Sequence, residues 1–235
     1  MSWNDEEFAL NYTCLSAEVR VGAYYLRFVL SPNFDVESLG QASTRFLGQL
    51  YHAFLTAEDV EIQVGCLNAM SKVYRRWDKQ PFDALTLSSL VRTLGGTQCP
   101  SPVRDALLQF LEAAIQNGGN ARQLVLASDC VPTLIRLLTR CHALRAAAST
   151  RAHDGVAVSI RSASLLRMLA EKQPGVCGAD RKLVRPVPRA KRLLAEPETF
   201  SKIVQVLLYP NRELAAAVMD VIQVVLSNND PDIIR

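Results

Sequence analysis

The chain has 235 residues, of which 49% are hydrophobic and 21% are charged, a balance typical of a folded protein rather than a disordered one. No stretch approaches the roughly 20 uninterrupted apolar residues that a membrane-spanning helix needs. The acidic start, Met1–Glu7, has no apolar stretch of the kind that signal peptides carry. We therefore expect a folded cytoplasmic protein, long enough for one sizeable core or for one elongated stack of helices.

The net charge of +3 is unevenly distributed along the chain. Residues 1–80 carry 7 basic and 10 acidic groups, a local charge of −3, whereas residues 136–192 carry 13 basic and 3 acidic groups, a local charge of +10. A basic region of this kind attracts nucleic acid, anionic lipid or an acidic protein, or it is simply a solvated surface. Charge alone does not decide between these possibilities.

Helical periodicity dominates the first half of the chain. Ser16 is placed to cap a helix over residues 19–30, which Ser31-Pro32-Asn33 would end, and a second helix is expected over residues 46–55. Apolar residues then recur at steps of three and four over residues 60–77 and again over residues 103–115. Ser101 and Pro102 precede the latter helix as expected N-terminal residues, and Asn117–Asn120 would close it.

Residues 120–138 contain a short helical segment, a small polar turn and then Val131-Pro132, which opens a second amphipathic helix. Proline is tolerated in the first turn of a helix because its missing N–H has no partner there. This order resembles the armadillo repeat. Further long helices are expected near residues 156–173 and 210–228, with a fraying end and loop at 145–155.

Successive long helices lie about 40 residues apart in the first half of the chain, a period typical of helical repeats. Amphipathic helices of this kind bury their apolar faces by stacking on their neighbours. No alternating apolar runs bounded by tight turns are present, so strands are not expected. We predict an all-α fold, an armadillo-like right-handed stack of roughly nine to eleven helices. Its expected parts are a helical lead-in at 1–57, repeats at 58–173, a basic proline-containing linker at 174–192 and a C-terminal repeat at 193–235.

Six cysteines are present, and none forms a Cys-x-x-Cys pair. We expect reduced thiols, mostly buried. Cys130 with Cys141-His142 lacks a second ligand pair at zinc spacing, so we expect no metal and no cofactor. Neither a glycine-rich phosphate loop nor a nucleophile elbow is present, so no enzyme is expected. We interpret the remaining chemically conspicuous side chains as a solvated acidic face (Asp105 and Glu112) and as apolar core (Tyr24, Tyr25, Trp77 and Phe110).

One basic run is the candidate binding site for an anionic partner or lipid. It holds six positive charges in twelve residues: Arg181, Lys182, Arg185, Arg189, Lys191 and Arg192. Each such charge near an anionic membrane contributes about 1 kcal/mol. The alternative interpretation, a solvated loop in which Pro-x-Pro holds the backbone extended, is favoured as the main reason for the run. Nucleic acid is not expected as a partner because this run has no aromatic side chains on which bases would stack.

Several short runs, in order along the chain, resemble a segment of the receptor-mediated endocytosis-8 family of large endosomal J-domain proteins. They span residues 2 to about 208 and are Ser2-Trp3-Asn4, Phe8, Tyr12, Cys14-Leu15-Ser16, Gly22-x-Tyr24-Tyr25-Leu26-Arg27, Leu50-Tyr51-His52-x-Phe54-Leu55, Cys66-Leu67-x-Ala69-Met70, Val73-Tyr74, Leu134–Thr139 and Arg185–Leu194.

The resemblance implies an armadillo-like segment of a peripheral endosomal co-chaperone. The family's J domain recruits the main cytosolic heat-shock chaperone, and its members are implicated in clathrin turnover, sorting-nexin function and cargo recycling. This chain lacks the His-Pro-Asp tripeptide of a J domain, because His153 is followed by Asp154 and both His52 and His142 by alanine. It also lacks the aromatic insert that animal members carry between the regions that match Thr139 and Arg185. The resemblance therefore implies the family's process and not its J-domain activity.

We thus expect a non-catalytic helical scaffold on the cytoplasmic side of endosomes. Its implied partners are a sorting nexin, clathrin-associated machinery, the heat-shock chaperone through a J domain that this chain lacks, and the anionic endosomal membrane. The alternative is an independent armadillo-type adaptor that binds other proteins, and a helical enzyme subunit is the third possibility. A downstream His-Pro-Asp in the same reading frame would distinguish the first from the second. A deep polar pocket with converging titratable groups would favour the third.

Overall fold

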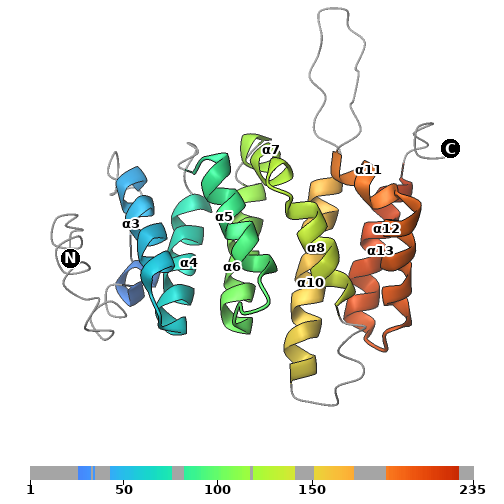
Figure 1. The fold of residues 1–235 in the computed structure, drawn as a ribbon, viewed down its shortest axis with the longest axis horizontal. Coiled ribbons are helices and arrows are strands. Elements are labelled where there is room, and N and C mark those ends of the chain that lie inside the picture. The colour runs from blue at the N-terminus through green and yellow to red at the C-terminus, as the bar shows by residue number, and fades with distance from the viewer. Residues whose placement is uncertain are drawn as a thin grey trace, which may run out of the picture.

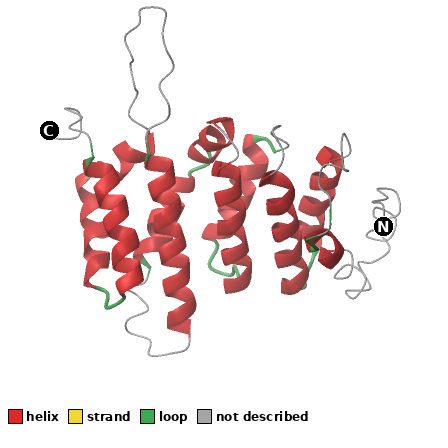
Figure 2. Ribbon diagram, turned by 180° about the vertical axis from the view of Figure 1, so that it is seen from behind, coloured by secondary structure: helices red, strands yellow, loops and turns green. Residues whose placement is uncertain are grey.

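The computed structural model describes residues 26–32, 34, 43–75, 82–116, 119–140, 151–171 and 189–227. Within these ranges the regular secondary structure is entirely helical, and Figure 2 shows no strand among them. The predicted all-α class is confirmed. Of the helix expected over residues 19–30, residues 26–30 are described and are helical, whereas residues 19–25, like most of the lead-in, lie outside the described residues.

Four long helices make up the first half of the described chain. After a helical turn at residues 26–30 come α3 (Ser43–Thr56), α4 (Val60–Arg75), α5 (Ala84–Gly95) and α6 (Ser101–Gln116). The helices expected over residues 46–55, 60–77 and 103–115 are therefore confirmed, with ends that differ by a few residues.

The second half contains two long helices, each preceded by shorter ones. In chain order, the helices of this half are α7 (Gly119–Ala127), α8 (Cys130–Thr139), α10 (Arg151–Ala170), α11 (Arg189–Ala195), α12 (Pro197–Gln205), the 3-10 helix η3 (Val206–Leu208) and α13 (Arg212–Leu226). The expected order of short helix, polar turn and second helix appears as α7, Ser128-Asp129 and α8. At this turn Asp129 has φ 56°, the left-handed conformation that lets the chain reverse between the two helices.

Three helices begin at a residue whose side chain caps exposed backbone N–H groups. The Asp59 carboxylate accepts from the N–H groups of Glu61 and Ile62 at the start of α4, at 2.7 and 3.2 Å. Asp83 accepts from the Thr86 N–H at 2.8 Å before α5, and Asn211 accepts from Leu214 N–H at 2.8 Å before α13. These short polar side chains satisfy donors that have no partner within the helix, and so they fix where each helix starts.

The helices lie side by side along the long axis of the molecule, from α3 at one end to α12 and α13 at the other (Figure 1). Among the long helices, α3 contacts α4, α4 contacts α6, α6 contacts α10 and α10 contacts α13. A second series joins α5 to α8 and α8 to α12. Each helix therefore buries its apolar side chains mainly against its neighbours in the row.

Aromatic side chains join the first four helices. The Tyr74 ring on α4 packs against Phe110 of α6 with centroids 5.6 Å apart, and Phe82, just before α5, lies 5.8 Å from Phe110 and 6.0 Å from Tyr74. Tyr51 of α3 reaches the same Phe82 ring at 5.9 Å. Phe110 is fully buried, which confirms its expected place in the core. Tyr24, Tyr25 and Trp77 lie outside the described residues.

Two expected loops are helical where the structure describes them. Residues 151–155, expected as a loop, begin α10, because the buried apolar face with Val158, Leu165 and Leu169 outweighs the roughly 1 kcal/mol that glycine at 155 costs a helix. Residues 189–192, assigned to the linker, form the start of α11, since Ala190 and Leu194 are buried one turn apart. The remaining linker residues, 174–188, lie outside the described part.

Candidate functional site

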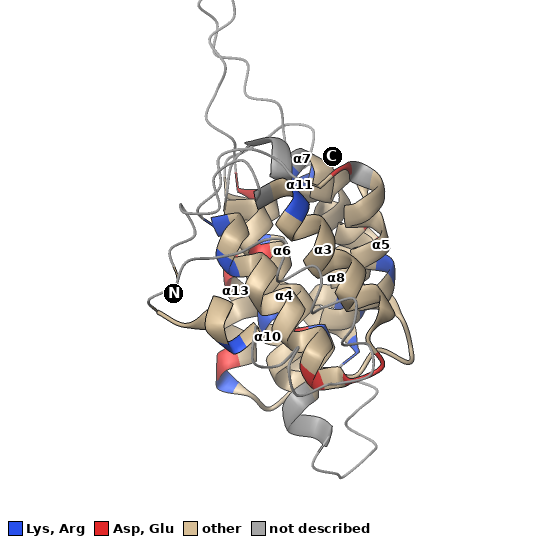
Figure 3. Cartoon of the chain, turned by 90° about the vertical axis from the view of Figure 1, so that its left-hand side faces the viewer, with Lys and Arg blue, Asp and Glu red and all other residues tan. Residues whose placement is uncertain are grey.

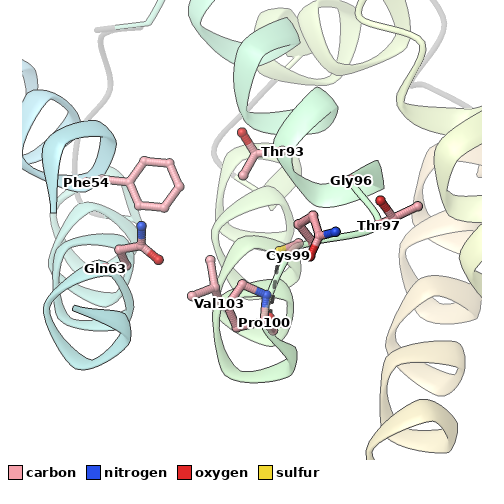
Figure 4. A pocket seen from close by; sticks show the side chains of 9 residues that line it. Phe54, Gln63, Thr93, Gly96, Thr97, Cys99, Pro100 and Val103 are labelled. Atoms are coloured by element: carbon pink, nitrogen blue, oxygen red, sulfur yellow. Dashed lines mark hydrogen bonds between the residues drawn. The ribbon is translucent and has the colours of Figure 1, made fainter. Parts of the chain in front are cut away.

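An open groove of about 400 Å³ lies where α3 and α5 end and where α4 and α6 begin. Phe54 and Gln63 form one wall, and Thr93, Cys99 and Val103 face them across the gap from the other (Figure 4). The remaining lining comes from Gly96, Thr97, Gln98 and Pro100. The groove is thus formed by two helix-to-helix turns that lie side by side.

The first wall is held by hydrogen bonds within the α3–α4 turn. The Gln63 side chain donates to the Ala57 carbonyl at 2.9 Å, and the Thr56 hydroxyl donates to the His52 carbonyl at 3.0 Å. Phe54 is only 2% exposed, so its ring is anchored in the core with one face on the groove. This wall is therefore a fixed surface.

The second wall is the loop from Gly96 to Pro100. The Gly96 N–H donates to the Thr93 carbonyl at 3.1 Å, and the Cys99 N–H donates to the Gly96 carbonyl at 3.4 Å. The Arg104 guanidinium donates to the same Gly96 carbonyl at 3.0 Å and so ties the loop to α6. Thr97 and Gln98, at the tip of the loop, are exposed.

The groove lining is mostly apolar and has no charged side chain. One titratable group in the lining is the Cys99 thiol. Burial raises the pKa of this thiol, and the nearby Arg104 charge lowers it to a smaller extent. A raised pKa keeps this thiol protonated and makes it a poor nucleophile.

A polar contact on the other side of α6 corrects one interpretation from the sequence. Arg161 of α10 lies between Asp105 and Glu112, with its Nε 2.9 Å from the Asp105 carboxylate and its Nη1 3.6 Å from Glu112. Gln109 donates to Asp105 at 2.8 Å. These carboxylates are half-buried and pair with α10, so they are a helix-to-helix contact and not simply a solvated face. Their seven-residue spacing puts both on one side of α6, but the sequence did not point to Arg161.

The basic run divides into two parts. Arg181, Lys182 and Arg185 lie outside the described residues, while Arg189, Lys191 and Arg192 belong to α11. Arg189 and Arg192 are exposed. Lys191 is 1% exposed, and its Nζ donates to the Ser227 carbonyl at the end of α13 at 2.6 Å. In this structure Lys191 therefore offers no surface charge to a partner.

Elsewhere charged residues of both signs are dispersed over several of the described helices, as the view from the N-terminal end shows (Figure 3). Of the cysteines, Cys66 and Cys130 are buried and Cys99 is half-buried, whereas Cys14, Cys141 and Cys177 lie outside the described residues. Within the described ranges, no three His, Cys, Asp or Glu side chains group closely enough to hold a metal ion. None of the helices there is both long and apolar enough to cross a membrane.

No model of a known protein family matches the chain, and no curated protein does. Among solved structures, the chain is similar to an engineered protein at 15% sequence identity with a TM-score of 0.40. That alignment covers 89% of this chain and 98% of the engineered one. A likeness of this size supports neither a family nor a function.

Proposed function

We propose that this chain is an armadillo-like, right-handed helical repeat stack that acts as a non-catalytic scaffold for protein binding. The observation that carries the proposal is the series of long helices α4, α6, α10 and α13, each packed on the next. The order of elements supports it further. The pairs α3–α4 and α5–α6 are followed by the triplets α7–α8–α10 and α11–α12–α13, each set ending in a long helix. Stacked repeats present extended surfaces of this kind for partner binding.

Within the scaffold, the groove beside Phe54 is the binding site that we favour. It is concave, apolar and open, and its walls are fixed by backbone hydrogen bonds. Such a surface loses little conformational freedom when an apolar anchor side chain of a partner enters it.

The parent process that we propose is endosomal sorting and recycling, as part of a J-domain co-chaperone of the receptor-mediated endocytosis-8 family. The ordered runs of matching residues support this, most of all 50–55, 66–74 and 185–194. A sorting nexin and clathrin-associated proteins are then the partners to test first. The chain would act from the cytoplasmic face of endosomes as a peripheral protein.

The test is direct binding of the purified chain to a purified sorting nexin, measured by isothermal titration calorimetry. Thr97→Arg places a long charged side chain at the exposed rim of the groove, and we expect it to weaken binding at least tenfold. Ser201→Arg makes the same charge change at an exposed position of α12 and should leave affinity unchanged. Equal affinity of the Thr97 variant and the unaltered chain would reject the groove as the site, and no binding to any sorting nexin would reject the partner.

We also propose that the basic run contributes contact with anionic endosomal lipid. Arg189 and Arg192 are exposed on one side of α11, next to Arg181, Lys182 and Arg185 in sequence. Changing these five residues to alanine should reduce flotation with phosphatidylserine vesicles, since each charge contributes about 1 kcal/mol near such a surface. Lys191 is kept in that variant because it is buried. Unchanged flotation would leave the run as a solvated segment.

A further inference from the structure

The last long helix, α13, carries two apolar stripes, of which one is covered. Its buried stripe is Leu214, Val218, Val221 and Val225, spaced four, three and four residues apart, and it packs on α10 and its neighbours. A second stripe has the same spacing and is shifted by one residue along the chain. It consists of Ala215, Met219, Ile222 and Leu226. Met219 is 52% exposed and Leu226 63% exposed.

The central helix α6 shows what a long helix buries when it has a neighbour on both sides. It lies between α4 and α10, and nine of its side chains are buried. α13 is packed by α10 on one side, and no other described element lies beyond it and α12 at that end of the row (Figure 1). Beside it, Val204 of α12 and Leu208 of η3 are 38% and 71% exposed. Exposed apolar residues therefore lie on three neighbouring elements at this end of the row, α12, η3 and α13.

We infer that this surface pairs with the same surface of a second copy of the chain, with two α13 helices packed antiparallel about a two-fold axis. A four-three-four spacing is the seam spacing of a coiled coil. An antiparallel pairing centred between Met219 and Ile222 brings Ala215 of each copy opposite Leu226 of the other, so that a small side chain meets a large one. Met219 then faces Ile222 twice. The stripe is self-complementary under this one operation, as a closed two-fold interface requires.

The charges around the stripe agree with the pairing. None of its four residues is charged, and the adjoining exposed residues Ala216 and Gln223 are neutral, so no like charges meet at the axis. Asp220 lies more than a quarter-turn away from the stripe because successive residues are 100° apart on a helix. Arg212, at the start of α13, comes to lie by the C-terminal end of the partner helix, where a positive charge is favoured.

The expected affinity follows from the size of the surface. A surface made of one helix stripe and its immediate neighbours belongs with the smallest specific interfaces, which bury roughly 1,000–1,200 Å² in total, and we therefore expect weak association with a dissociation constant in the micromolar range. This inference does not rest on the endosomal role proposed above. It requires only that α13 is folded.

The experiment is sedimentation velocity on the full 235-residue chain between about 1 and about 200 µM, the range that an interface of this size calls for. We expect the 26.0 kDa monomer to give way to a dimer as concentration rises. Met219→Glu should weaken the dimer at least tenfold. Leu85→Glu, the same kind of change at a position of α5 that is 79% exposed, should leave it unchanged. Circular dichroism on each variant confirms that it is folded.

A mixing experiment tests the register. Because Met219 faces Ile222 of the other copy, Met219→Glu and Ile222→Lys chains should each associate weakly alone and form a heterodimer when mixed. A chain that stays monomeric throughout the range would overturn the inference, as would assembly beyond a dimer. Dimerisation that survives Met219→Glu, or a mixture that fails to associate although both variants are folded, would overturn the proposed pairing.

Discussion

Replacing Lys191 by alanine tests whether a charged residue of the basic run is part of the core. Its side chain is 1% exposed, and its ammonium group donates to the Ser227 carbonyl at 2.6 Å. A hydrogen bond from a charged donor contributes about 1.5–3 kcal/mol. Loss of three buried methylene groups, at about 0.8 kcal/mol each, removes roughly 2 kcal/mol more. We therefore expect Lys191→Ala to lower the free energy of unfolding by about 3.5–5 kcal/mol.

Lys191→Met separates the two contributions because methionine restores most of the methylene packing. It also removes the cost of burying an ammonium group, so we expect a loss of only about 1–2 kcal/mol, chiefly from the missing hydrogen bond. Lys202→Ala is the control, since Lys202 is exposed and pairs with Glu198 one turn away on α12; such pairs contribute about 0.3–0.5 kcal/mol.

The measurement is urea unfolding followed by circular dichroism, with amide hydrogen exchange to place the effect at the end of α13. A loss below 1 kcal/mol for Lys191→Ala, or equal losses for the Lys191 and Lys202 variants, would refute the buried placement of this side chain.

Three further predictions concern local backbone and thiol chemistry. Gly48→Ala, in open space on α3, should stabilise the protein by about 0.5–1 kcal/mol through helix propensity. Gly65→Ala should instead destabilise it by about 1 kcal/mol, because the added Cβ would lie 2.8 Å from the buried Leu26 side chain. Thermal melts of the two variants check this, and equal shifts in melting temperature would contradict it. Asp129→Gly should stabilise by about 0.5–1 kcal/mol, since glycine adopts φ 56° without steric cost and Asp129 makes no side-chain capping bond; an unchanged or lowered melting temperature would count against it. Burial raises the pKa of the Cys130 thiol to about 12. At pH 9, the ordinary pKa of a cysteine, this thiol should therefore resist iodoacetamide in the native protein and react once urea is added. Rapid labelling of the native protein, measured by mass spectrometry, would show that the thiol is accessible.

The sequence predicted the long helices well because their apolar residues repeat at helical spacing. The stripe Leu214, Val218, Val221 and Val225 is completely buried, and the polar turn before Val131-Pro132 separates two helices as expected. Both predictions rest on local signals, a periodic face and a proline placed at a helix start.

Helix α5 was missed although its signals are present. Asp83 caps it, and Leu87, Leu90, Val91 and Leu94 follow at helical spacing and are buried. The sequence-based prediction nevertheless places no helix between residues 77 and 103, where α5 spans Ala84–Gly95. The information that defines α5 is therefore local in the sequence.

The groove could not be predicted in the same way. Phe54, Gln63 and Cys99 are far apart in sequence, and each is unremarkable in its own helix or loop. They come together because the α3–α4 turn and the α5–α6 loop lie side by side, which depends on how whole helices pack. Without a known packing arrangement, no spacing in the sequence relates them.

The basic region from 136 to 192 shows that the role of a charged residue depends on where it lies in the fold. In the part of it that the structure describes, Arg136 donates to the Gly95 carbonyl at 3.3 Å, Arg161 bridges two carboxylates of α6, and Lys191 binds the end of α13. Each of these long side chains joins one helix to another. Lys72 does the same outside the region, donating to the carbonyls of residues 29 and 31, where the first described helical turn ends. A cation is favoured beside carbonyls at the end of a helix and can pack its methylene chain against apolar neighbours. Part of the local excess of +10 therefore holds the row of helices together, and the charge open to an anionic partner is smaller than the sequence count implies.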